Sequence, residues 1–241
     1  MPRFSVNDED ISSGFAEISG ADYRHLVHVR RVKPGETVYL AGKSGSYYCG
    51  IVSEIGSGSV RVRITESFAI SGTGLDISLY LCLIKGGNFE YAIQKSVEVG
   101  VNRIIPVISE RTVPDPDKKT EKKRERWNRI AEGACKQCMR GGPVPVGLPL
   151  GFAEAVESDT SDVKIAGHPG APLQVRDFLH GVERPRTVSI LIGPEGGFSE
   201  SELITAGRYG WNMLNFGFTH LRAETAAAVI PALIIYHWSS I

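Results

Sequence analysis

The chain has 241 residues, of which 42% are hydrophobic and 22% are charged, and its formal net charge is zero. This composition is typical of a globular protein that buries a sizeable core in one or two domains. A zero net charge excludes the global positive field that many nucleic-acid binders carry, so any basic surface must be local.

The N-terminal part, residues 1–70, is predicted to form a small β domain. Short β-rich segments separated by glycines occupy residues 37–40, 47–52 and 60–64. The last of these alternates apolar with basic residues, which indicates one buried and one exposed face. Because short antiparallel strands must close or stack to protect their edges, we expect a β-barrel.

Residues 71–74, Ser-Gly-Thr-Gly, have the composition of a linker, and the pattern after them becomes α/β. The alternation of strands and helices predicts a mostly parallel sheet with helices on both faces, in a second domain of residues 75–241. Strands are expected at 77–84, 103–108, 163–166, 188–192 and 211–216. Helices are expected at 88–99, 121–139, 173–179, 200–209 and 224–238.

A glycine-rich segment, Gly193-Pro194-Glu195-Gly196-Gly197, follows the predicted strand 188–192. Its glycines allow the backbone to approach a ligand closely. Ser199 and Glu202 have the spacing of a capping box, which predicts a strand–loop–helix unit at the carboxyl edge of the sheet, where ligands bind. The segment matches neither a P-loop nor a dinucleotide fingerprint. A tight turn without a ligand accounts for the spacing equally well.

A second motif begins the last predicted helix. Arg222, Glu224 and Thr225 place a cation, a carboxylate and a hydroxyl at a helix N-terminus, where free amides also point outward. Ordinary capping and dipole pairing is the alternative interpretation. Glu224 can also orient the Arg222 guanidinium through a charge-assisted hydrogen bond.

Metal, disulfide and membrane interpretations find little support. Cys135 and Cys138 fall within one predicted helix and lack a second pair of ligands, so no metal site is expected. Four scattered cysteines do not form a disulfide framework. The N-terminus lacks the apolar core of a signal peptide, and the apolar stretch 226–238 is shorter than the ~20 residues of a membrane span. A cytoplasmic location without membrane contact is expected.

Two basic clusters could contact RNA. The first lies at residues 24–33 of the β domain, and a barrel with clustered Arg and His is a plausible phosphate-binding platform. The second, at residues 118–129, is diluted by glutamates, and a solvated face is as good an interpretation.

Together the motifs resemble the RsmE-type family of 16S ribosomal RNA (uridine-N3) methyltransferases, of the SPOUT superfamily. The resemblance covers nearly the whole chain and includes the two closing motifs, 192–198 and 221–226. The chain departs from the family pattern at Gly87-Asn88-Phe89 and Phe218-Thr219-His220. The other matching positions include His25, Arg30, Arg31, Lys33, Gly35, Lys85, Glu90, Gln94, Lys95, Glu98, Arg111, Gln137 and Arg140.

The resemblance implies a PUA-like N-terminal barrel, a C-terminal trefoil knot, a homodimer, and S-adenosylmethionine as the methyl donor. It implies 16S rRNA as the substrate, within the assembled small subunit. The implied RNA-binding residues are Arg24, His25, Arg30, Arg31, Lys85, Gln137 and Arg140. The implied cofactor-binding residues are Ala166, Gly167, His168, Ile192, Gly193, Glu195, Gly197, Leu214, Phe216, Gly217, Leu221, Arg222, Thr225 and Ala226.

Methylation of uridine N3 requires loss of its proton and stabilisation of charge on the neighbouring carbonyl oxygen. Arg222 is the predicted catalytic cation, and Glu224 is the predicted base or orienting group. Two alternatives stay open: a non-enzymatic RNA-binding or ribosome-assembly factor, and an enzyme that methylates another RNA position or a ribose.

Overall fold

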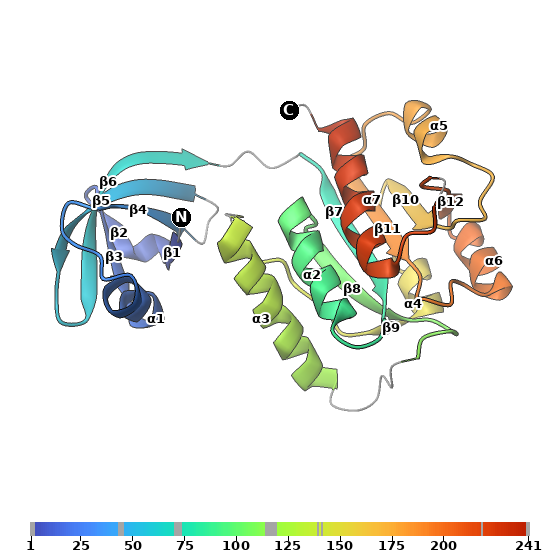
Figure 1. The fold of residues 1–241 in the computed structure, drawn as a ribbon. Helices are drawn as coiled ribbons and strands as arrows, with labels where there is room; N and C mark the ends of the chain where they lie inside the picture. Colours follow the sequence, from blue (N-terminus) through green and yellow to red (C-terminus); the bar gives the residue numbers. More distant parts are fainter. Residues whose placement is uncertain are drawn as a thin grey trace. The chain divides into compact units, whose positions relative to one another are not determined.

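The structure, a computed structural model, describes residues 3–42, 46–69, 74–113, 120–138, 140, 142–217 and 219–239. The chain divides into two compact units, one of residues 1–71 with 132–143 and the other of residues 72–131 with 144–241. Each unit contains its own sheet (Figure 1). The grouping of residues 132–143 with the N-terminal unit is a feature that the sequence does not indicate.

The N-terminal unit is built on a six-stranded sheet with the order β1-β4-β5-β6-β3-β2. Strands β1 and β4 are parallel, and the other neighbours are antiparallel. Between β3 and β4, helix α1 (Gly20–Arg24) runs into a π-helical turn (His25–Val29). The strands are β1 (Arg3–Val6), β2 (Ile11–Ser12), β3 (Phe15–Ser19), β4 (Thr37–Gly42), β5 (Ser46–Ile55) and β6 (Ser59–Ala69).

One core serves most of this sheet. Val60 and Val62 of β6 are fully buried, whereas Arg61 and Arg63 are exposed, which confirms the predicted alternation. Side chains of β1, β3, β4, β5 and β6 share a single hydrophobic cluster with Leu26 of the π-helical turn. The first three strands were not predicted, because they are short and lie before the first recognisable alternation.

The C-terminal unit is built on a parallel sheet with the order β12-β10-β11-β7-β8-β9, which confirms the expected α/β class. Its strands are β7 (Asp76–Cys82), β8 (Arg103–Ile108), β9 (Leu150–Gly151), β10 (Val163–Gly167), β11 (Thr187–Ile192) and β12 (Asn212–Leu214). Its helices are α2 (Asn88–Val99), α3 (Thr120–Cys138, which ends among the residues grouped with the other unit), α4 (Phe152–Glu157), α5 (Val175–His180), α6 (Glu200–Arg208) and α7 (Ala223–Trp238).

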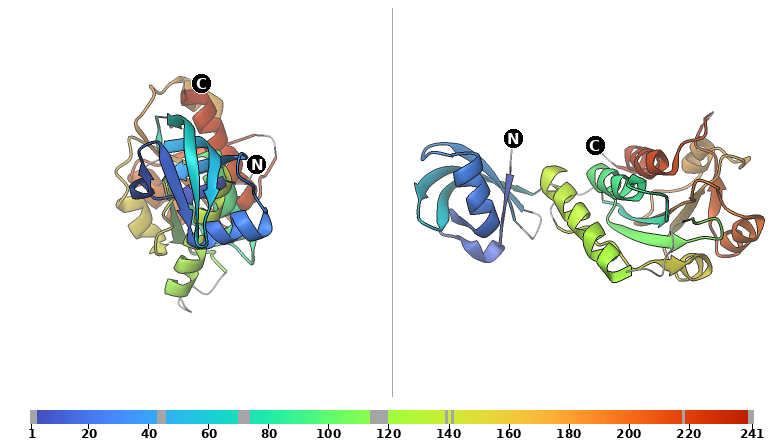
Figure 2. Two further views of the ribbon diagram at one scale, coloured as in Figure 1. Left: turned by 90° about the vertical axis from the view of Figure 1, so that its left-hand side faces the viewer. Right: turned by 60° about the horizontal axis from the view of Figure 1, so that its bottom comes forward.

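Helices cover both faces of the parallel sheet (Figure 2). On one face, Tyr80 and Cys82 of β7 share a cluster with side chains of α4 and α6. On the other face α2 packs against α7, where the Ser96 hydroxyl donates a hydrogen bond to the Ala227 carbonyl over 3.1 Å. Gly100 is the C-cap of α2, and a Cβ there would lie 2.9 Å from the side chain of Ile235 in α7. The two helices therefore approach closely at the C-terminal end of α2. Burial on both faces explains the near-continuous apolar sequence of the central strands.

The predicted boundaries differ from the structure in a few places. Helix 88–99 and strand 103–108 have the predicted limits. The predicted strand 211–216 is too long, because the backbone of Asn215 bonds to Leu173 and Val175 instead of extending β12. Strand β9 and helix α4 were not predicted, and Met139, the predicted end of α3, lies outside the described residues.

Candidate active site

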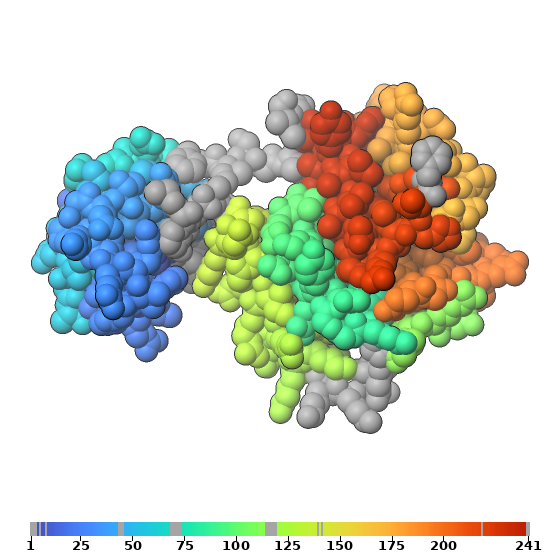
Figure 3. Space-filling view, viewed as in Figure 1, coloured from blue at the N-terminus to red at the C-terminus, as the bar shows by residue number. Residues whose placement is uncertain are grey.

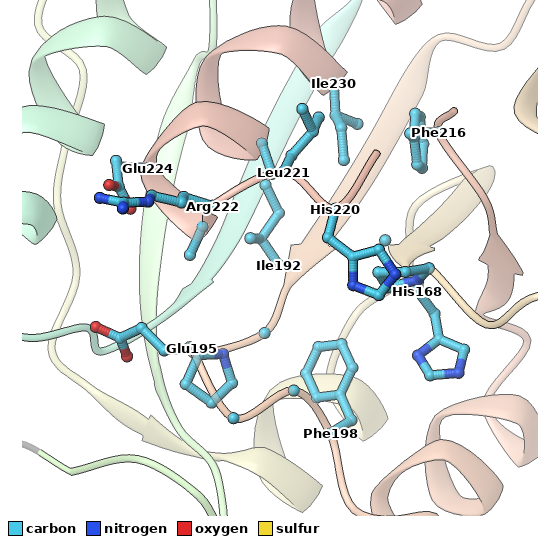
Figure 4. Close-up of a pocket in the computed structure, with 18 of the residues that line it drawn as sticks. His168, Ile192, Glu195, Phe198, Phe216, His220, Leu221, Arg222, Glu224 and Ile230 are labelled. Carbon is cyan, nitrogen blue, oxygen red and sulfur yellow. The ribbon is translucent and has the colours of Figure 1, made fainter. Parts of the chain in front are cut away.

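A cavity of about 650 Å³ opens at the carboxyl edge of the parallel sheet (Figure 4). Its walls come from the loops that follow β10, β11 and β12 and from the first turns of α7. Asn88 and Arg111, which follow β7 and β8, complete the wall. Parallel strands all end at this edge, so the topology gathers residues that are far apart in sequence. The volume lies within the range of ~300–1,000 Å³ typical of small-molecule sites.

The loop between β11 and α6 depends on its glycines. A Cβ on Gly193 would lie 3.1 Å from the ring of Phe198, so glycine leaves room for this ring to pack. Gly197 has a φ of +68°, and its N–H donates to the Pro194 carbonyl over 2.9 Å, which closes a turn. The ring of Phe198 in turn lies 5.6 Å from that of Phe152 in α4. The glycines therefore let the loop backbone follow the cavity wall.

The predicted capping box at the start of α6 is confirmed. The Ser199 hydroxyl accepts a hydrogen bond from the Glu202 N–H over 3.3 Å, and the Ser199 N–H donates to the Glu202 carboxylate over 2.9 Å. The same carboxylate is buried and accepts a second bond, of 2.8 Å, from the Glu110 N–H after β8. Glu202 thus links the helix start to a neighbouring strand end.

Two further hydrogen bonds tie this loop to the sheet. The Glu195 carboxylate accepts a bond of 3.0 Å from the Lys85 N–H, which follows β7. The Arg111 guanidinium donates a bond of 2.8 Å to the Gly196 carbonyl. The glycine-rich loop is therefore fixed to the ends of both β7 and β8.

The loops after β10 and β12 are joined by backbone bonds. The His168 N–H donates to the Leu214 carbonyl over 2.9 Å. The Asn215 N–H donates to the Leu173 carbonyl over 2.9 Å, and the Val175 N–H donates to the Asn215 carbonyl over 3.0 Å. The segment after β12 is thereby bound to both ends of the loop 168–175.

Arg222 and Glu224 bring charge to the cavity at the start of α7. Arg222 is the N-cap, with extended backbone, and its carbonyl accepts the Ala226 N–H over 2.8 Å. Both side chains line the cavity and lie toward the same side as Glu195, away from His168 (Figure 4). Among the ion pairs of the described residues, none joins Arg222 to Glu224, so the guanidinium–carboxylate pairing expected from the sequence is not formed.

Most of the predicted cofactor residues line this one cavity. Four do not. Ala166 and Leu214 are fully buried inside the sheet, whereas the last residues of β10 and β11, Gly167 and Ile192, do reach the cavity. Gly217 and Thr225 are exposed and lie outside the lining. The predicted residues that line the cavity are Gly167, His168, Ile192, Gly193, Glu195, Gly197, Phe216, Leu221, Arg222 and Ala226.

The predicted RNA-binding residues are mostly exposed, and the cavity lining includes none of them. Lys85 is next to the cavity wall through its N–H bond to Glu195. Arg140 is half-buried. The exposed ones in the N-terminal unit, as divided above, are Arg24, His25, Arg30, Arg31 and Gln137. Of the second basic cluster, Lys118 and Lys119 lie outside the described residues.

Sequence reasoning missed several residues of the cavity wall. Asn88 and Arg111 were noted only as part of motifs, although both lie in the segments that follow strands β7 and β8, which end at the ligand-binding edge. That position after a parallel strand was the available signal. Phe198 and Asn215 also line the cavity, and the hydrogen bonds and ring packing that place them are tertiary contacts that a linear pattern does not contain.

Burial changes the acidity of two groups beneath the site. It raises the pKa of the Cys82 thiol to about 12 and that of the Tyr80 hydroxyl to about 12.

Cys135 is buried and Cys138 half-buried, and no group of three or more potential metal ligands occurs among the described residues. None of the described helices combines the length and apolar character of a membrane-spanning segment.

The chain was compared with known proteins. Residues 72–235 match the RNA methyltransferase domain family. Ribosomal RNA small subunit methyltransferase E of Synechocystis is 28% identical over 96% of this chain and 76% of its own length. A protein from Legionella pneumophila, solved in complex with S-adenosylmethionine, is 30% identical, covers 96% of both chains and has a TM-score of 0.80.

A second solved structure matches over the whole chain. Ribosomal RNA small subunit methyltransferase E of Neisseria gonorrhoeae, bound to S-adenosylmethionine, is 28% identical and has a TM-score of 0.85. It is covered over 99% of its length, and this chain over 100%. With the cavity placed where both closing motifs meet, the chain belongs to the RNA methyltransferase domain family and, within it, to the RsmE type.

Proposed function

We propose that this protein transfers the methyl group of S-adenosylmethionine to N3 of a uridine in 16S rRNA of the small ribosomal subunit. One observation carries the proposal: the two closing motifs, 192–198 and 221–226, meet in a single cavity. Relatives that match over nearly the whole chain are named for methylation of small-subunit ribosomal RNA.

The cavity fits S-adenosylmethionine in size and in chemistry. Ile192, Leu221 and Ile230 offer apolar surface to a nucleoside, and the loop glycines bring backbone groups to the wall. Charged side chains at one side suit the amino-acid part of the cofactor or the polar edge of a substrate base (Figure 4). When bound, S-adenosylmethionine supplies an activated methyl group on a positively charged sulfur.

The charged side chains then act on the uridine. The N3 proton must leave before N3 can form a bond to a methyl group, and the Glu224 carboxylate, which is half-buried and lines the cavity, is proposed to accept it. Negative charge grows on the neighbouring carbonyl oxygen, and the Arg222 guanidinium stabilises it. Correct alignment of the two reactants contributes the remaining acceleration.

The finer fold assignments belong to the same proposal. A trefoil knot in the C-terminal unit is supported by Asn215, whose backbone and side chain bond to both ends of the loop 168–175. A PUA-like closed barrel in the N-terminal unit is supported by the shared core of β1 and β3, which lie near opposite ends of the strand order. This barrel, with its exposed Arg30 and Arg31, is the proposed RNA platform.

We also propose that the enzyme works as a homodimer in the cytoplasm. Val229, Leu233 and Tyr236 form a stripe along α7, and they are 36%, 40% and 80% exposed. The space-filling view shows α7 on the viewed face of the C-terminal unit, next to α2 (Figure 3). An apolar stripe of this kind on a helix suits burial against a second copy.

Methyl transfer from labelled S-adenosylmethionine to purified small subunits that lack the modification tests the proposal. Label is expected in 16S rRNA, at N3 of one uridine after nuclease digestion. Label on a ribose or another base would redirect the assignment. Subunit binding without cofactor binding or transfer would instead support the non-enzymatic RNA-binding alternative.

A further inference from the structure

Arg111 is an exposed cation at the wall of the cavity, and no role beyond its bond to the glycine-rich loop has been given to it so far. It follows β8 by three residues and donates a hydrogen bond of 2.8 Å to the Gly196 carbonyl. Gly196 is itself exposed, so this bond lies at the open side of the cavity. A residue here can meet a large substrate as it approaches the cofactor site.

The stem of Arg111 lies against Gly196. A Cβ on Gly196 would lie 3.3 Å from the Cβ of Arg111 and 3.4 Å from its Cδ, which is closer than side chains ordinarily pack. Glycine at position 196 therefore makes room for the arginine. This close fit restricts the rotamers of a side chain that is otherwise flexible, and so lowers the entropy lost when its head group binds a ligand.

A buried carboxylate holds the backbone on the N-terminal side of Arg111. Glu202 accepts the Glu110 N–H over 2.8 Å and the Ser199 N–H over 2.9 Å, and the residue is only 6% exposed. On the same segment, the Ser109 N–H donates to the Thr112 hydroxyl over 2.9 Å. Arg111 therefore lies on a turn whose backbone is held by these hydrogen bonds. Binding groups are kept in place by supporting contacts of this kind.

The guanidinium keeps capacity to bind an anion. It carries five N–H donors in a planar fork, and among the described residues its one hydrogen-bond partner is the Gly196 carbonyl. The planar fork matches two oxygens of a phosphate. It lines the same cavity as Arg222 and Glu195, and its bond to Gly196 puts it next to Glu195 in the loop, where the target nucleotide is proposed to react.

We propose that Arg111 binds a backbone phosphate of the RNA at or next to the target uridine, and that Glu202 is the residue that positions it. The inference rests on the proposed function, because it assumes RNA at the charged side of the cavity. The same fork could instead hold the carboxylate of the cofactor, and the experiment separates these two anions.

The test compares Arg111→Ala and Arg111→Lys with the matched control Arg208→Ala, an exposed arginine of α6 outside the cavity lining. Unmodified small subunits are bound at several salt concentrations, and S-adenosylmethionine is titrated separately by calorimetry. Arg111→Ala should weaken subunit binding about tenfold, as lost charged hydrogen bonds do. It should also lower the salt slope by about 1. Arg111→Lys should keep the slope and lose part of the affinity, and Arg208→Ala should change neither.

Glu202→Gln tests the positioning role, because its amide can accept only one of the two N–H bonds. It should weaken subunit binding in the wild-type background and add little to Arg111→Ala, since the two residues act together. Fully additive losses would show that Glu202 acts only through stability, and would overturn its positioning role.

The inference is wrong if Arg111→Ala leaves subunit binding and its salt slope unchanged. It is equally wrong if cofactor affinity falls while subunit binding is retained, which would assign the fork to the cofactor carboxylate. The test measures binding constants for the subunit and for the cofactor, so it still decides the role of Arg111 if the wild-type protein methylates an atom other than uridine N3. Methylation of another atom would contradict the proposed function and leave the inference about Arg111 standing.

Discussion

The Glu195 carboxylate accepts a hydrogen bond of 3.0 Å from the Lys85 N–H, across 110 positions of sequence. This bond joins the end of β7 to the glycine-rich loop after β11, and both strands are neighbours in the sheet. Because Glu195 lines the cavity, this bond fixes the loop that is proposed to hold the cofactor.

Glu195→Ala is therefore expected to weaken S-adenosylmethionine binding about five- to tenfold, the effect of one net hydrogen bond. Glu195→Gln keeps an acceptor oxygen and should retain most of the affinity. Calorimetry on both variants measures this, with Glu200→Ala, an exposed carboxylate outside the cavity lining, as the control. A glutamine variant as weak as the alanine variant would show that charge, not hydrogen bonding, matters at this position.

Arg222 is expected to act in the transition state more than in binding. Arg222→Ala should lower the single-turnover methylation rate by about 10²–10³, the range for loss of one preorganised donor. Arg222→Lys should be nearly as damaging, because it keeps the charge but loses the planar fork. Dissociation constants for cofactor and RNA should change little by comparison. Loss of cofactor binding with a normal rate at saturation would make the residue structural.

The basic cluster of the N-terminal unit is expected to bind RNA without contributing to the cofactor site. Replacing Arg30 and Arg31 with alanine should weaken small-subunit binding and flatten its salt dependence, as lost phosphate contacts do. Cofactor affinity should stay the same. The control removes equal charge from the same unit through Arg61→Ala and Arg63→Ala, both exposed on β6. Equal losses in the two double variants would argue against a specific RNA surface at the first cluster.

Cys82 gives a prediction for alkaline pH. Burial raises the pKa of its thiol from the ordinary value of 9.0 to about 12. Above pH 9 the unfolded chain therefore loses a proton that the folded chain keeps, so stability present below pH 9 is lost as pH rises toward 12. The slope is about 1.4 kcal/mol per pH unit in the free energy of unfolding. Denaturant unfolding between pH 8 and 10.5 should show a shallower decline for Cys82→Ala, and identical declines would contradict the buried, protonated thiol.

Periodicity predicted the long elements of the C-terminal unit well and the short ones poorly. Helix α2 is twelve residues long, enough for its apolar stripe to appear in sequence. Helix α4 has six residues, fewer than two turns, and no stripe can be read from it. Strand β12 was predicted too long, because the backbone of Asn215 already bonds to the loop 168–175 and Phe216 lines the cavity.

For the site, motif spacing predicted the loops but not which of their residues reach the cavity. The three glycines at positions 193, 196 and 197 could be recognised from sequence, whereas the need for glycine at 193 becomes visible only beside the ring of Phe198. Arg111 and Glu202 are linked through the Glu110 N–H and the capping box, which are contacts between distant segments. Such pairings depend on strand order, and no local pattern contains that information.

The most direct test of the central claim is mass spectrometry of 16S rRNA from cells with and without this protein. The account predicts that one uridine carries a base methyl group at N3 in the first sample and none in the second, and that the Arg222→Ala protein fails to restore it. An rRNA methylation pattern that is identical in the two samples would contradict the account.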